Sequence, residues 1–156
     1  MLNSLPILLI TCLYANDTAQ TPAIVTVNVR ETVVYVGSNA VVEISVDVKE
    51  GYHIQAKEVN DESLIPTTLE VERNEYIQVE QGFPPSKQFK LEGTDNVLQV
   101  YDGKFLIKLF LFPVAKAQAR KYVLSSKLKY QACDSKSCLF PRVIKFSIPL
   151  EIKPKK

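Results

Sequence analysis

The sequence is poor in several residue types that common functional sites require. Its 156 residues contain no tryptophan, one histidine, five glycines and three cysteines. A single histidine cannot supply a multi-histidine metal site or a typical zinc finger, and so few glycines argue against a phosphate-binding loop. The formal net charge is only +2, from 19 basic and 17 acidic residues, so we expect no nucleic-acid partner. With 46% apolar and 23% charged residues, the composition is that of one globular domain.

The N-terminal residues have the character of an export signal rather than of a folded element. The apolar stretch from Leu5 to Tyr14 has about ten residues, which is too short to span a bilayer and typical of a signal peptide. We therefore expect a signal peptide at residues 1–19 and one mature domain at residues 20–156. Cys12 would leave with the signal; the alternative is a lipid anchor at this cysteine. We expect no membrane span in the mature chain.

Beyond the signal, apolar residues recur at every second position, as they do in half-buried strands. The segments from Val42 to Val48 and from Ile144 to Ile152 show this alternation clearly. The segment from Phe105 to Phe112 is almost entirely apolar, which is typical of a strand in the middle of a sandwich. About seven to nine short strands separated by turn residues predict an all-β fold, an immunoglobulin-like antiparallel β-sandwich. One short helical candidate remains, at residues 114–120.

Two cysteines, Cys133 and Cys138, lie between two strongly patterned segments with four residues between them. We expect them at or near the tip of a β-hairpin, where their Cα atoms come within the roughly 4.4–6.8 Å that a disulfide needs. As a staple the bond would contribute little, because closing a loop of about six residues removes only about 2 kcal/mol of unfolded-state entropy. A short, exposed bridge suits thiol–disulfide exchange better. Lys136 and Arg142 would stabilise a thiolate there, whereas Asp134 would oppose it.

A metal site is not expected. Two thiolates and the distant His53 provide at most three ligands with no standard spacing, so we interpret His53 as a strand residue with an ordinary hydrogen bond.

The cysteine segment also resembles a known family. Tyr130-Gln131-Ala132-Cys133 followed by Cys138-Leu139-Phe140-Pro141 is similar to the signature of the N-terminal domain of the bacterial thiol:disulfide interchange protein DsbD. The spacer is one residue shorter than in the best-known members, and Leu139-Phe140-Pro141 stands where a double proline is common. Three further segments resemble the family, and the likeness extends over most of residues 24–152: Gly51-Tyr52-His53-Ile54, Leu64-Ile65-Pro66-Thr67 and Tyr101-Asp102-Gly103.

The resemblance implies roles for individual residues. Cys138 would form the mixed disulfide with a partner, and Cys133 would resolve it. Tyr52 and His53 would lie close to the pair, although both are equally well interpreted as ordinary residues of the sandwich. An aromatic residue on a cap loop shields the pair in the family; the candidates here are Phe83 and Tyr101, each of which has an equally good interpretation as core.

The resemblance also implies a location and partners. The domain would lie in the periplasm, need no cofactor, and act as a protein-disulfide reductase. A thioredoxin-like protein would donate its electrons, and oxidised thioredoxin-fold proteins would accept them, such as disulfide isomerases or those of cytochrome c assembly. The sequence contains no counterpart of the family's membrane and thioredoxin-like domains, so we expect a stand-alone domain and a monomer.

A rival interpretation comes from the residues alone. The chain could be a non-catalytic exported β-sandwich, a binding or assembly module whose hairpin disulfide only stiffens a recognition loop. The two interpretations differ in whether the activity depends on the cysteine pair.

Overall fold

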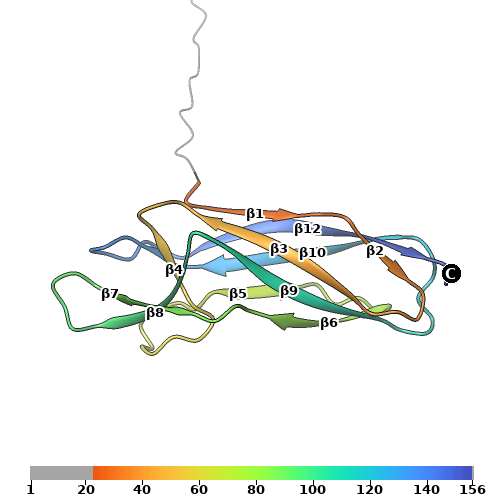
Figure 1. Cartoon of the computed structure of the whole chain (residues 1–156), viewed down its shortest axis with the longest axis horizontal. Coiled ribbons are helices and arrows are strands. Elements are labelled where there is room, and N and C mark those ends of the chain that lie inside the picture. Colours follow the sequence, from red (N-terminus) through yellow and green to blue (C-terminus); the bar gives the residue numbers. More distant parts are fainter. Residues whose placement is uncertain (1–22, 156) are drawn as a thin grey trace, which may run out of the picture.

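The computed structural model describes residues 23–155, which form twelve strands in three four-stranded sheets (Figure 1). The predicted signal peptide and Cys12 lie outside the described residues. Within residues 23–155, no helix is long and apolar enough to cross a bilayer.

The first sheet is antiparallel throughout and carries one side of the core. In spatial order its strands are β1 (Val25–Val29), β3 (Ala40–Val48), β9 (Lys104–Pro113) and β6 (Ile77–Gly82). The apolar segment at residues 105–112 is indeed a central strand, because β9 lies between β3 and β6. It is buried on one face only: Ile107, Leu109 and Leu111 point into the core, whereas Leu106 and Phe110 are 38% and 37% exposed.

The second sheet carries the other side of the core. Its strands, in spatial order, are β2 (Thr32–Tyr35), β12 (Arg142–Lys153), β10 (Lys121–Tyr130) and β5 (Thr68–Val71). The short β2 runs parallel to β12, and the other neighbours are antiparallel. In β10 the burial alternates at every residue, as the sequence pattern predicts.

Side chains from both sheets form one continuous apolar core. Ile44 and Leu109 come from the first sheet, and Leu128 and Ile148 from the second; none of these four side chains is exposed. The predicted all-β, immunoglobulin-like sandwich is therefore confirmed. The helical candidate at residues 114–120 is wrong: this segment is a turn between β9 and β10, closed by a hydrogen bond from Ala117 N to Val114 O. The segment is too short to form a stable helix with a buried face. It connects β9 of the first sheet to β10 of the second sheet.

The third sheet positions the cysteine pair. Its strands, in spatial order, are β11 (Ala132–Cys133), β4 (His53–Gln55), β8 (Val97–Asp102) and β7 (Lys87–Lys90), all antiparallel. These strands lie at the end of the molecule that is far from the C-terminus (Figure 1).

Candidate functional site

Cys133 and Cys138 form a disulfide at the tip of the hairpin between β10 and β12, as the sequence predicts. The turn is held by hydrogen bonds from Asp134 N to Ser137 O (2.9 Å) and from Leu139 N to Ala132 O (2.8 Å). The two cysteine Cα atoms are 3.9 Å apart, closer than expected, because the residues lie directly opposite one another in a narrow hairpin. The turn therefore brings the two cysteines together by local hydrogen bonds.

The two cysteines differ sharply in exposure. Cys133 lies in β11 and is 0% exposed, whereas Cys138 is an exposed residue on the outer side of the turn. An incoming thiolate must approach one sulfur of a disulfide directly. Cys138 is thus the accessible end of the bridge, and Cys133 the protected end.

The disulfide turn also contains an acidic residue, Asp134, directly after Cys133. Asp134 Oδ1 accepts hydrogen bonds of 2.8 Å from the backbone N–H groups of both Lys136 and Ser137. These donors hold the pKa of the Asp134 carboxyl below its ordinary value. The carboxylate therefore stays ionised close to Cys138 and opposes thiolate formation, as the sequence suggests.

Gln55, on β4, is the only residue within residues 23–155 whose side chain forms hydrogen bonds with both sulfurs. Its Nε2 lies 3.2 Å from Cys133 Sγ and 3.7 Å from Cys138 Sγ. The residue is 0% exposed, and its Oε1 has no hydrogen-bond partner within the described residues. Sequence reasoning missed Gln55, although the segment that resembles the family ends one residue before it.

His53, also on β4, lies directly opposite Cys133 on one side and Asp102 on the other. Paired residues of neighbouring strands share a face, so His53 and Cys133 are neighbours on one side of the sheet, as the resemblance implies. Burial lowers the pKa of His53, and the charges of Asp102 and Asp134 only partly oppose this. The imidazole is therefore neutral at neutral pH, and its Nε2 is buried without a partner in residues 23–155.

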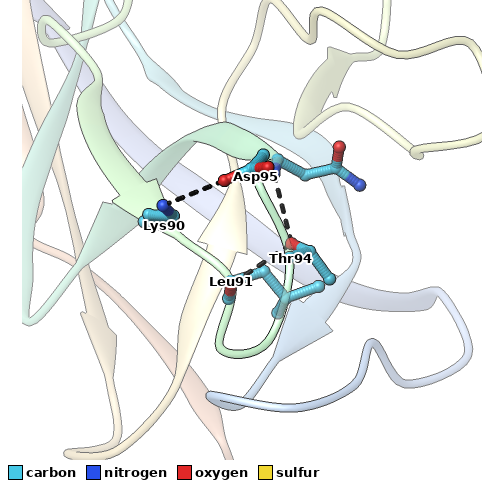
Figure 2. Close-up of polar contacts among 5 residues, drawn as sticks. Lys90, Leu91, Thr94 and Asp95 are labelled. Atoms are coloured by element: carbon cyan, nitrogen blue, oxygen red, sulfur yellow. Dashed lines mark hydrogen bonds and ion pairs between the residues drawn. The ribbon is translucent and has the colours of Figure 1, made fainter.

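The turn between β7 and β8 (residues 91–96) lies beside the disulfide turn. Glu92 N donates a hydrogen bond of 3.2 Å to Ser135 O, which joins the two turns directly. Figure 2 shows how the β7–β8 turn is itself closed: Lys90 Nζ lies 3.2 Å from Asp95 Oδ1, and Thr94 Oγ1 donates to Leu91 O. The β7–β8 turn is thus a direct neighbour of the disulfide turn.

The aromatic residue on this side of the site is Phe89, on β7. Its ring lies 4.1 Å from that of His53, measured between centroids. Tyr101 instead pairs with Ile54, so it lies on the opposite face of the sheet from His53 and Cys133. Phe83 stacks on Tyr101 at 6.3 Å. The structure therefore places both of the sequence-based cap candidates on the core side of the sheet.

A shallow groove of about 740 Å³ runs along the sheet next to the disulfide turn. Tyr52, His53, Phe89, Asp102 and Ser135 contribute to its lining. Neither cysteine lines this groove, and the hydrogen bonds to the two sulfurs come from Gln55, not from Tyr52. Within residues 23–155, no three His, Cys, Asp or Glu side chains are grouped so that they could hold a metal ion.

Comparison with known proteins gives a structural match without a sequence match. No protein-family model and no curated protein matches the sequence. The structure is similar to the N-terminal periplasmic domain of ScsB from Proteus mirabilis, with a TM-score of 0.53 and 13% identity. The fold is shared with a DsbD-like protein. The match covers 81% of this chain but only 44% of the ScsB chain.

Two other solved structures match with lower scores. The periplasmic chaperone SfaE gives a TM-score of 0.39 at 13% identity, covering 85% of this chain and 57% of that one. AggA, the major subunit of aggregative adherence fimbriae type I from Escherichia coli, gives 0.38 at 8% identity, covering 83% and 95%. The match to the ScsB domain alone, at a TM-score of 0.53, bears out the resemblance to the N-terminal domain of DsbD, and it does so for the fold only.

Proposed function

We propose that this chain is an exported, periplasmic protein-disulfide reductase domain that passes electrons to oxidised partner proteins through Cys133 and Cys138. The observation that carries the proposal is the unequal exposure of the two cysteines of one short disulfide. A structural staple has no need of an accessible sulfur, whereas exchange requires that an incoming thiolate reach one sulfur of the pair. The likeness of the fold to the periplasmic domain of ScsB supports the same function.

The reaction has two displacement steps. In the reduced protein, the Cys138 thiolate attacks a partner disulfide, so a mixed disulfide forms and one partner sulfur leaves as a thiolate. The Cys133 thiolate then attacks Cys138 Sγ, the intramolecular disulfide forms, and the second partner sulfur leaves. Two electrons pass from the dithiol to the partner, and the two protons released by the cysteines end on the partner's thiols. A thioredoxin-like donor would reverse these steps on this chain.

The surface beside Cys138 is suited to a protein partner. Phe140 is 91% exposed, and Val143, at the start of β12, is 52% exposed. Large exposed aromatic side chains are frequent anchors in protein–protein contacts. The exposed aromatic side chain two residues after Cys138 therefore favours another protein over a small thiol as the reaction partner. Oxidised thioredoxin-fold proteins are the proposed class.

A trapping experiment tests the proposal. Reduced Cys133→Ala lacks the resolving thiol, so it should accumulate a mixed disulfide when incubated with purified oxidised thioredoxin-fold proteins, visible on a non-reducing gel. The matched control is Cys138→Ala, which keeps one cysteine but in the buried position, and should trap far less. Equal trapping by both variants, or none by either, would contradict the proposal and favour a non-catalytic binding module.

A further inference from the structure

Gln55 is fixed in position before it contacts the sulfurs. Its strand, β4, is paired on both sides, with β11 and with β8. Its own backbone N–H donates to Gln131 O (3.1 Å), and its carbonyl accepts a hydrogen bond from Thr67 Oγ1. With both main-chain groups held and the side chain wholly buried, the amide has little freedom to turn away from Cys133.

The disulfide form leaves polar atoms in this pocket unsatisfied. Within residues 23–155, only two buried side-chain polar atoms lack a hydrogen-bond partner: Gln55 Oε1 and His53 Nε2. Both residues are on β4, on the face that carries Cys133. Unpaired buried polar atoms are costly, and a disulfide sulfur is only a weak acceptor for the Gln55 amide. The buried polar atoms of Gln55 and His53 are therefore poorly satisfied while the disulfide is intact.

Reduction of the disulfide offers Gln55 Nε2 a stronger hydrogen-bond acceptor. When the disulfide takes up two electrons, Cys133 becomes a thiol or a thiolate at the position of the present sulfur. A thiolate accepts a much stronger, charge-assisted hydrogen bond from Gln55 Nε2 than a disulfide sulfur does. The thiolate therefore holds the buried Gln55 amide more strongly than the disulfide does.

We propose that Gln55 is a catalytic residue of the redox pair, whose side-chain amide stabilises the reduced state of Cys133 and so makes the Cys133–Cys138 disulfide easier to reduce. The role of Gln55 in exchange rests on the proposed function. Its effect on the redox equilibrium of Cys133 and Cys138 does not, because that equilibrium is a property of this protein alone. Gln55 also orients the Cys133 sulfur within reach of Cys138, because its Nε2 approaches both sulfurs.

The test is the equilibrium between the protein disulfide and reduced glutathione, measured for the wild type and for Gln55→Met. Methionine keeps the length of the side chain but removes both amide atoms. We expect the equilibrium constant for reduction to fall about tenfold, which for a two-electron couple is about 30 mV towards a more reducing potential. The control is Gln81→Met, because the Gln81 amide donates to Leu69 O and forms no hydrogen bond with a sulfur within residues 23–155. This variant should leave the constant unchanged.

A second measurement needs no variant, so it holds even if Gln55→Met does not fold. In ¹⁵N NMR spectra of the wild type, the side-chain amide of Gln55 should shift and become more protected from exchange on reduction, whereas that of Gln81 should not. An unchanged constant in folded Gln55→Met, or an unchanged Gln55 amide signal on reduction, would overturn the inference. Neither result depends on trapping a protein partner, so failure of the proposed function would be recognised separately.

Discussion

Opening the Cys133–Cys138 bridge should leave the sandwich folded, with only a small loss of stability. The bridge joins residues five apart in sequence, so it closes a loop of six residues counting both cysteines. Chain entropy for such a loop is worth about 2 kcal/mol. The turn hydrogen bonds from Asp134 N and Leu139 N already bring the strands together. Because the turn closes the loop without the bridge, about 2 kcal/mol is an upper value.

The assay is urea denaturation of the oxidised protein and of the protein kept reduced by a phosphine. The free energy of unfolding should fall by no more than about 2 kcal/mol on reduction. A core variant, Leu128→Ala, calibrates the assay, because removing this fully buried side chain should cost about 2–5 kcal/mol. A loss above about 4 kcal/mol on reduction, or an unfolded reduced protein, would refute the reasoning, since it would make the bridge a structural staple.

Two further predictions concern the neighbours of the pair. The pKa of His53 is lowered in the fold from its ordinary value of 6.5, so the unfolded chain binds the proton more readily. Stability should therefore be full above pH 6.5 and fall as the pH drops below it, and urea midpoints of His53→Phe should lack this part of the pH dependence. Phe140→Ser removes an exposed side chain, so stability should change by less than about 0.5 kcal/mol. Stopped-flow rates with an oxidised protein partner should fall several-fold, while rates with oxidised glutathione stay the same; equal slowing with both would refute a docking role.

The strands that were predictable from sequence are those with two unlike faces. In β10, buried Leu128 stands between exposed Lys127 and Lys129, and that contrast is visible in the sequence. The three residues of β4 are all buried, so no alternation marks this strand, although it carries His53 and Gln55. Local pattern alone does not indicate such a segment, because its burial comes from strands β8 and β11 on either side.

The site was predictable only in part for a similar reason. The cysteine pair and its hairpin follow from a short local segment, and the structure confirms both. The contact between Gln55 and Cys133 joins residues 78 positions apart, which no spacing rule reaches. Likewise, the choice of Phe89 over Tyr101 as the aromatic residue near the pair depends on the strand register that assigns the two to opposite faces of the third sheet.

The reduction potential of the Cys133–Cys138 pair tests the central claim most directly. Equilibration of the protein in defined thiol buffers, followed by quantification of free thiols, measures it without any assumed partner. An exchange protein should give a value of roughly −180 to −270 mV, within the range of known thiol–disulfide exchange proteins. A value below about −300 mV would contradict the account, because ordinary thiol donors could not open such a bridge.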